Sequence, residues 1–250
     1  RHCLILDKFQ NFARMSSKLF LDLVKIIKPY DTRYRVAISP EERTLVALRY
    51  LATEESYKSL YYGFHVGHST ICKLIPEVCT AICDGLQEKF MPNETEGSGL
   101  QFFNYKGYHS IVLQAIADAE GCFTLIEVGD YGRRSDGGMF RSSVVGQNVA
   151  TGSFCLPEEG IVLVTNQSCP CFIVGDEAYP LLTNLIRTYP KRSLDNARRI
   201  FNRRLSRARK SVECAFGMMT AKRRVFEKPM VKPENVDSIV KAAYTMHNYV

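Results

Sequence analysis

Two acidic residues, Asp176 and Glu213, stand where a carboxylate can do chemistry. Asp176 directly follows the apolar run at residues 172–175, which is typical of a buried strand because it follows a proline and is too short for a helix. A side chain at the end of such a strand emerges into the crevice at the edge of the sheet. Glu213 stands beside the apolar positions Val212 and Phe216 of a long helical pattern, so we expect it at the rim of the buried face.

These two residues suit a divalent metal site for phosphoryl transfer. That reaction uses metal ions about 4 Å apart, held by carboxylates from different structural elements, and Mg²⁺ or Mn²⁺ prefers oxygen ligands. Two other interpretations stay open. Asp176 can cap its own turn, and Glu213 can pair with Arg209 or Lys210 on its helix.

Basic residues gather in the same part of the chain as Glu213. Residues 191–224 hold twelve Lys or Arg against two acidic residues, and the whole chain has a formal net charge of +7. So few acids cannot pair all of these cations, which favours contact with the phosphates of DNA. A solvated helix face is the alternative. The predicted DNA-binding residues of this stretch are Arg198, Arg199, Arg203, Arg204, Arg207, Lys210, Arg223 and Arg224.

Length and composition limit the classes of protein to which this chain can belong. A chain of 250 residues with 46% hydrophobic content can form one large domain or two small ones with a packed core. Its nine cysteines lie in apolar surroundings, which indicates free thiols in a reducing compartment, and the close pair Cys169 and Cys171 has the wrong spacing for zinc. No apolar run approaches about 18 residues and no signal-peptide pattern opens the sequence, so we expect an intracellular protein without membrane insertion.

The N-terminal third of the chain is predicted to be helical. Apolar residues recur at helical spacing over residues 15–27, and the string SPEE at residues 39–42 supplies a cap, a first-position proline and first-turn acids for another helix. Residues 56–75 have the layout of a helix-turn-helix, with a glycine turn before a helix that begins at Ser69. Lys73 on that helix is a predicted DNA contact. Two helices of an ordinary bundle are the alternative interpretation.

Strands are predicted after the polar segment 93–99, which marks a domain boundary. Residues 108–118 and 122–129 are rich in β-forming residues and are joined by a short glycine turn, so they are predicted to form an antiparallel hairpin. Further helices are predicted to begin at Ser135-Asp136, to run over 194–224, and to span 238–249. This order predicts an α/β or α+β nuclease-like domain over residues 92–250, preceded by a helical, helix-turn-helix-like domain over residues 1–91.

Several strings of the sequence resemble those of the PIF/Harbinger transposases and their domesticated relatives. The resemblance covers nearly the whole chain and includes FNYKGYHSIVLQAIADAEGCF, VGDYGRRSDGGMF, VGDEAYPL and RARKSVECAFGMMTAKRRVF. It implies an RNase H-like nuclease domain with a mixed sheet flanked by helices, which uses an Asp, Asp, Glu triad and divalent metal ions, Mg²⁺ or Mn²⁺. On that resemblance Asp176 and Glu213 match the second Asp and the Glu. Asp136 matches a further acidic position that supports the metal or the fold.

One departure from the family pattern concerns the first Asp of the triad. The family places it in a strand before the FNYKG segment, but residues 91–100 run directly into that segment, and no Asp stands between Asp84 and Asp118. The nuclease domain therefore lacks its first strand, and Asp118 is interpreted as a turn residue. Losing one of three metal carboxylates weakens metal binding and the activation of the attacking group.

The sequence leaves two hypotheses of different classes. The first is a Harbinger-type DNA endonuclease or recombinase that uses divalent metal ions on phosphodiesters, with Asp176 and Glu213 as catalytic metal ligands. The second is a domesticated, catalytically inactive DNA-binding or protein-interaction module that retains the fold, which the missing first Asp favours. We further expect a nuclear location that can extend to the cytoplasm, and the resemblance implies a Myb-like DNA-binding partner protein. A homo-oligomer stays open.

Overall fold

The chain divides into two compact units. The computed structural model describes residues 2–27, 38–53, 55–90, 112–130, 136–154, 156, 160–162, 167–192, 194–226 and 235–250. Unit 1 comprises Arg1–Glu94, Cys122–Thr124 and Ala215–Val250, and unit 2 comprises Thr95–Gly121 and Leu125–Cys214. The domain boundary predicted between residues 91 and 92 falls outside the described residues and stays a prediction.

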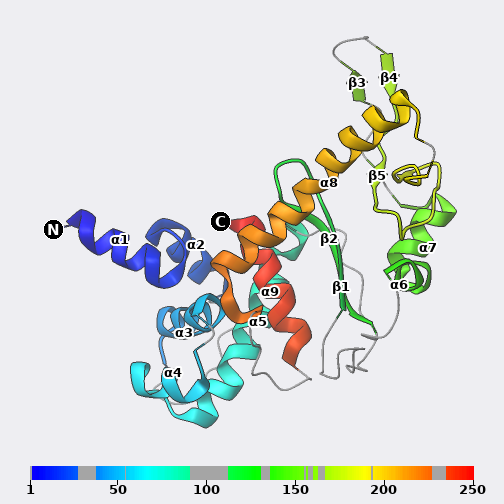
Figure 1. Cartoon of the computed structure of the whole chain (residues 1–250). Coiled ribbons are helices and arrows are strands. Elements are labelled where there is room, and N and C mark those ends of the chain that lie inside the picture. The colour runs from blue at the N-terminus through cyan, green and yellow to red at the C-terminus, as the bar shows by residue number, and fades with distance from the viewer. Residues whose placement is uncertain are drawn as a thin grey trace. The chain divides into compact units, whose positions relative to one another are not determined.

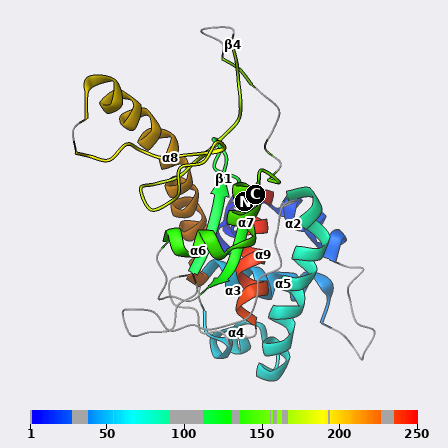
Figure 2. The ribbon, with the colours of Figure 1, turned by 90° about the vertical axis from the view of Figure 1, so that its right-hand side faces the viewer.

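Unit 1 is mostly helical. Its main helices are α1 (His2–Ala13), α2 (Ser17–Ile27), α3 (Pro40–Thr53), α4 (Tyr57–Phe64), α5 (His68–Phe90) and α9 (Val236–Tyr249), labelled in Figure 1. Helix α9 packs along α5, and Figures 1 and 2 both show the two side by side. The helices predicted over residues 15–27, from Pro40 and over residues 238–249 are confirmed.

Serine caps set where α2 and α3 begin. The Ser16 hydroxyl oxygen accepts a hydrogen bond from Leu19 N at 3.3 Å, and that of Ser39 accepts one from Glu42 N at 3.1 Å. Each bond satisfies a backbone N–H that has no partner inside its own helix. The cap and the first-position proline read from the SPEE string are therefore confirmed.

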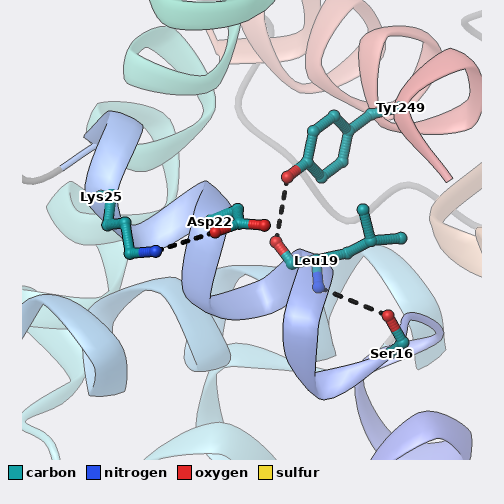
Figure 3. A network of polar contacts seen from close by, with 5 residues as sticks. All are labelled: Ser16, Leu19, Asp22, Lys25 and Tyr249. Atoms are coloured by element: carbon teal, nitrogen blue, oxygen red, sulfur yellow. Dashed lines mark hydrogen bonds and ion pairs between the residues drawn. The ribbon is translucent and has the colours of Figure 1, made fainter.

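Tyr249 ties the last helix to α2. Its hydroxyl donates a hydrogen bond to the Leu19 carbonyl at 3.0 Å, beside the cap that Ser16 forms (Figure 3). Burial, and then the charge of Asp22, raise the pKa of the Tyr249 hydroxyl, so it stays protonated and donates. Asp22 in turn binds Lys25 at 2.9 Å, and this contact lowers the pKa of the Asp22 carboxyl. The Tyr249 bond joins residues 230 positions apart in the sequence.

The preceding residue, Asn248, joins three segments of unit 1. Its Oδ1 accepts a hydrogen bond from Phe123 N at 2.9 Å, and its Nδ2 donates to the carbonyls of Phe123 and Phe90, both at 2.7 Å. Phe90 ends α5, and Phe123 begins strand β2 (Phe123–Asp130). The Phe123 ring packs against Phe216 and Tyr244, with centroids 5.3 and 4.6 Å away. One side-chain amide thus holds α9 against both elements.

Unit 2 is built from short strands and helices. Its described elements are β1 (Val112–Ala117), most of β2, α6 (Asp136–Ser142), α7 (Val144–Thr151), β3 (Gly160–Val162), β4 (Gln167–Cys169), β5 (Ile173–Val174) and β6 (Leu185–Ile186). Helices α6 and α7 are the two short green helices of Figure 2. Strands β1 and β2 pair with each other across a turn in which Gly121 has φ of 84°, so the hairpin predicted over residues 108–118 and 122–129 is confirmed at its centre.

The described strands form three two-stranded sheets rather than the single mixed sheet expected from the resemblance. Besides the β1–β2 sheet, β3 pairs antiparallel with β4 and β5 pairs parallel with β6. No described strand is a common neighbour of these pairs. A small core of residues from β2, α6, α7 and β6 is formed by Leu125, Phe140, Val145, Val149 and Leu185.

The long helix α8 (Asn196–Lys222) changes character along its length. Within unit 2 it buries Leu205 alone, and Ala208, which was predicted to lie on the apolar stripe, is exposed. Within unit 1 it buries Ala215 and Met219. The predicted helix over residues 194–224 is confirmed. Its predicted apolar stripe is consistently buried only toward the C-terminal end. Neither α8 nor any other described helix has the length and apolar composition to cross a membrane.

The cysteines that the structure describes are free thiols, as predicted, and they stand at positions 72, 79, 83, 122, 169, 171 and 214. Cys79 and Cys83 are buried in the core of unit 1. Burial raises the pKa of the Cys79 thiol, so this group packs as a small apolar side chain and stays protonated.

Arg223, directly after α8, is buried without a partner. Its side chain is 1% exposed, and none of its three guanidinium nitrogens has a hydrogen-bond partner among the described residues. Burial, and then the charge of Arg14, lower the pKa of Arg223 to about 10. The group therefore stays charged at neutral pH, and an uncompensated buried charge destabilises the fold.

We predict that Arg223→Met raises the free energy of unfolding by about 1 to 4 kcal/mol, because methionine keeps the apolar stem and removes the desolvation cost. Arg224→Met, at the exposed neighbouring position, is the matched control and should change stability by less than about 0.5 kcal/mol. Denaturant unfolding followed by circular dichroism measures both. A lower unfolding midpoint for Arg223→Met than for the parent chain would contradict this account.

Candidate functional site

Asp176 occupies the first position of a tight turn that follows β5. One of its carboxylate oxygens accepts a hydrogen bond from Ala178 N at 2.8 Å, and its carbonyl accepts one from Tyr179 N at 3.3 Å. The preceding residue, Gly175, still donates to the Ile186 carbonyl of β6 at 2.9 Å. The β5–β6 pairing therefore extends to the residue before the Asp176 turn, which we define as residues 176–179.

Asp176 therefore caps its own turn, as one of the interpretations of the sequence expected. One carboxylate oxygen serves the turn, and the other is left for a further partner. Strand β5 is half-buried and two residues long, whereas the sequence predicted a buried strand. The reason is that β5 pairs only with β6 among the described strands, so one of its edges has no neighbouring strand.

The first turn of α6 packs directly on the Asp176 turn. A Cβ on Gly137 would lie 2.1 Å from the Ala178 carbonyl oxygen, so only glycine permits this approach. Three residues on, the Phe140 ring meets the Tyr179 ring edge to face, with centroids 5.2 Å apart. Asp136 is the first residue of α6 and precedes Gly137 in the chain, so its backbone lies near the turn. The side chain of Asp136 lies outside the described residues.

Arg187 binds the backbone of the Asp176 turn. Its Nη1 donates to the carbonyls of Glu177 and Tyr179, each at 3.0 Å. Two turn carbonyls are thus held by one cation that follows β6 in the chain. Sequence reasoning missed this residue, because an isolated arginine after a short strand carries no signal. The glycine pair Gly137-Gly138 after Asp136 is the sequence feature that indicates a close approach between α6 and the turn.

Glu213 is exposed on α8 and pairs with Arg209 one turn earlier. The distance between Arg209 Nη2 and Glu213 Oε1 is 2.5 Å, and the Glu213 side chain is 52% exposed. Glu213 is therefore more exposed than its predicted position at the rim of a buried face, although Val212 and Phe216 beside it are half-buried. The local ion pair that the sequence offered as an alternative is the arrangement found.

Comparison with protein families places these residues in a known context. A family model described as DDE superfamily endonuclease matches residues 85–248, which is more than half of the chain and includes Asp136, Asp176 and Glu213. This chain belongs to the DDE superfamily endonucleases. No curated protein and no solved structure gives a significant match.

Membership in the DDE endonuclease family makes the chain a relative of transposase-like nucleases. It indicates an RNase H-like fold for the matched region, and the short sheets with surrounding helices of the described residues agree with such a fold. The superfamily generally uses divalent metal ions. The described acids of this DDE endonuclease can therefore be compared with what such ions require.

The described residues do not assemble the donor set of a triad-bound metal site. No group of three or more His, Cys, Asp or Glu among them is placed to hold a metal ion. Asp176 already caps its own turn, and Glu213 is neutralised by Arg209. A carboxylate in an ion pair is a weaker metal ligand, because the metal must first displace the cation.

Basic side chains cover the unit 2 part of α8. Arg198, Arg199, Arg203, Arg204, Arg207 and Lys210, which we call the α8 basic face, are all exposed. Asp195 contacts Arg198 at 3.9 Å, and the other five have no ion-pair partner among the described residues. Arg224 is also exposed, in the short 3-10 helix η2 (Arg224–Phe226). Arg223 differs from the predicted set because its buried side chain is not available to a DNA phosphate.

Helices α4 and α5 are joined by the short connection of residues 65–67, as in a helix-turn-helix. The turn begins with His65 in the left-handed conformation, and the Gly67 carbonyl accepts hydrogen bonds from Thr70 N and Ile71 N at 2.9 and 3.0 Å. Helix α5 begins at His68, one residue before the predicted start. Lys73 is exposed on α5. DNA recognition by this pair stays a prediction, beside the interpretation as ordinary bundle helices.

We predict that Gly137→Ala destabilises unit 2, by about 1 to 3 kcal/mol, because the added methyl group must push α6 away from the Ala178 carbonyl. Gly217→Ala is the matched control, since a Cβ at Gly217 meets nothing within 4 Å and alanine favours the interior of α8. Thermal unfolding should show a lower midpoint for Gly137→Ala and an equal or higher one for Gly217→Ala. Equal midpoints for Gly137→Ala and the parent chain would refute the close contact.

Proposed function

We propose that this chain is a DNA-binding protein of the PIF/Harbinger transposase type, which engages the phosphate backbone through the α8 basic face. One observation carries the proposal: the unit 2 part of α8 presents exposed cations that no described residue neutralises. The strings around Asp176 and Glu213 support the Harbinger assignment within the DDE endonuclease family. A nuclear location is part of the same proposal.

The charge distribution of α8 supports a polyanionic ligand. From Asn196 to Val212 the helix holds seven Lys or Arg and no Asp or Glu. Ion pairs at Asp195 and Glu213 stand at the two ends of this stretch, and among the described residues they engage only Arg198 and Arg209. Like charges one turn apart destabilise an isolated helix. A DNA backbone lying along the helix would relieve this repulsion and release its own counterions.

We predict that DNA affinity falls with salt, and that Arg203→Gln, Arg204→Gln and Arg207→Gln together flatten this dependence. Each lost phosphate contact should reduce the slope of log K against log salt by about 0.9. Fluorescence anisotropy with a labelled duplex measures the slope. Lys8→Gln, Lys18→Gln and Lys89→Gln remove three exposed charges from unit 1 and form the matched control. A slope near zero for the parent chain would refute phosphate contact.

A second proposal concerns chemistry: this chain by itself does not cleave DNA. The sequence lacks the first Asp of the triad, and the described acids do not gather into a metal-binding group. Such a protein corresponds to the inactive, domesticated class of the family. In that case Asp176 and Glu213 are retained residues of the former metal site, the first in its turn and the second on its helix.

We predict that supercoiled DNA incubated with the chain and Mg²⁺ or Mn²⁺ is nicked no faster than with the Asp176→Asn and Glu213→Gln variants. The comparison with these isosteric variants removes the contribution of a contaminating nuclease, because contamination is not affected by the substitutions. Gel electrophoresis of the plasmid measures nicking. Cleavage by the parent chain that both variants lose would show an active enzyme and overturn this second proposal, without touching the binding proposal.

A further inference from the structure

Two exposed aromatic rings lie among the cations of α8. Tyr189 precedes α8 and is 44% exposed, and Phe201 on α8 is 36% exposed. Their rings meet edge to face, with centroids 5.3 Å apart. The Arg198 guanidinium lies over the Tyr189 ring, 5.2 Å from its centroid. We call Tyr189, Phe201 and Arg198 the aromatic platform.

The aromatic platform is held in place by Asn202. The side-chain Oδ1 of Asn202 accepts a hydrogen bond from Tyr189 N at 2.8 Å, and its Nδ2 donates to the Tyr189 carbonyl at 2.9 Å. The backbone of Tyr189 is therefore fixed to α8 by two bonds that do not involve its ring. An aromatic side chain with a fixed backbone loses little entropy when a ligand stacks on it.

Cations flank the platform on the helix surface. Arg198 and Arg204 stand three residues before and after Phe201, so both lie on the same side of α8 as its ring. Arg204 is exposed and has no ion-pair partner among the described residues. Exposed rings between arginines are the arrangement by which proteins stack unpaired bases and hold the neighbouring phosphates.

We propose that the aromatic platform binds unpaired bases of single-stranded DNA. The proposal rests on the proposed function, since the same helix holds the phosphates, and it adds a preference for an unpaired strand. In a duplex the face of each base is covered by the neighbouring base pairs of the stack, so the rings have no free base face to stack on. A second copy of this chain is a poor occupant, because two α8 basic faces would repel each other.

The absence of tryptophan in the chain permits a direct readout of stacking. Phe201→Trp introduces one indole at the platform, and Leu21→Trp introduces one at a 54% exposed position of α2 as the matched control. Stacking of a base on an indole quenches its fluorescence. Addition of oligo(dT) should quench Phe201→Trp and leave Leu21→Trp unchanged, whereas a blunt duplex should quench neither. Equal quenching of both variants, or of neither, by oligo(dT) would overturn the proposal.

A binding measurement separates this proposal from the proposed function. The double variant Tyr189→Leu, Phe201→Leu keeps the bonds of Asn202 and all cations, and should weaken oligo(dT) binding at least about fivefold while duplex affinity stays within about twofold. Equal weakening on both DNAs, or on neither, refutes the platform but leaves phosphate binding by α8 intact. Failure of the parent chain to bind either DNA refutes both. A tenfold preference for oligo(rU) over oligo(dT) would assign the platform to RNA and overturn the DNA proposal.

Discussion

The amide side chain of Asn248 supplies the contact on which unit 1 depends. It forms hydrogen bonds with both the end of α5 and the start of β2. The last helix is therefore held against elements from the first half of the chain. Tyr249 adds a bond from the same helix to α2. Because α9 belongs to this unit, the end of α8 is also included, and Ala215 and Met219 find apolar neighbours there. The physical cause is that a buried polar backbone atom without a partner is costly, and Asn248 satisfies three of them.

The two roles of α8 follow from this division. Toward its C-terminal end the helix has an apolar side that is buried in unit 1, as an amphipathic helix should. Toward its N-terminal end only Leu205 is buried, and seven cations stand without an acid among them. Such a segment gains little from burial and is destabilised by its own charge, which a polyanion beside it would relieve. The exposed rings of Tyr189 and Phe201 occur in this part of the helix, where apolar side chains have no core to enter.

The acids Asp176 and Glu213 have different local environments in this DDE endonuclease. Asp176 is fixed by a turn that Arg187, Gly137 and the β5–β6 pair hold from several sides. Glu213 is exposed and pairs with its own helix. The turn around Asp176 thus retains a rigid support, whereas nothing described holds Glu213 toward it.

Sequence alone determined the features that depend on neighbours along the chain. The SPEE start of α3, the short strand before Asp176, the hairpin about Gly121 and the concentration of cations after Lys191 are all local patterns, in which a cap, a turn or a charge run acts within a few residues. Family motifs likewise located Asp176 and Glu213 in the matched region.

Only the tertiary structure decided what those residues touch. It buried Arg223, although its sequence neighbours are exposed cations, because the chain enters the core of unit 1 at that point. It exposed Ala208 and Glu213, although helical periodicity placed them on or beside an apolar stripe, because a stripe is buried only where another element covers it. It also brought Gly137 against Ala178 and Arg187 onto the same turn. Contacts between residues distant in sequence depend on how elements pack, and no local pattern encodes that packing.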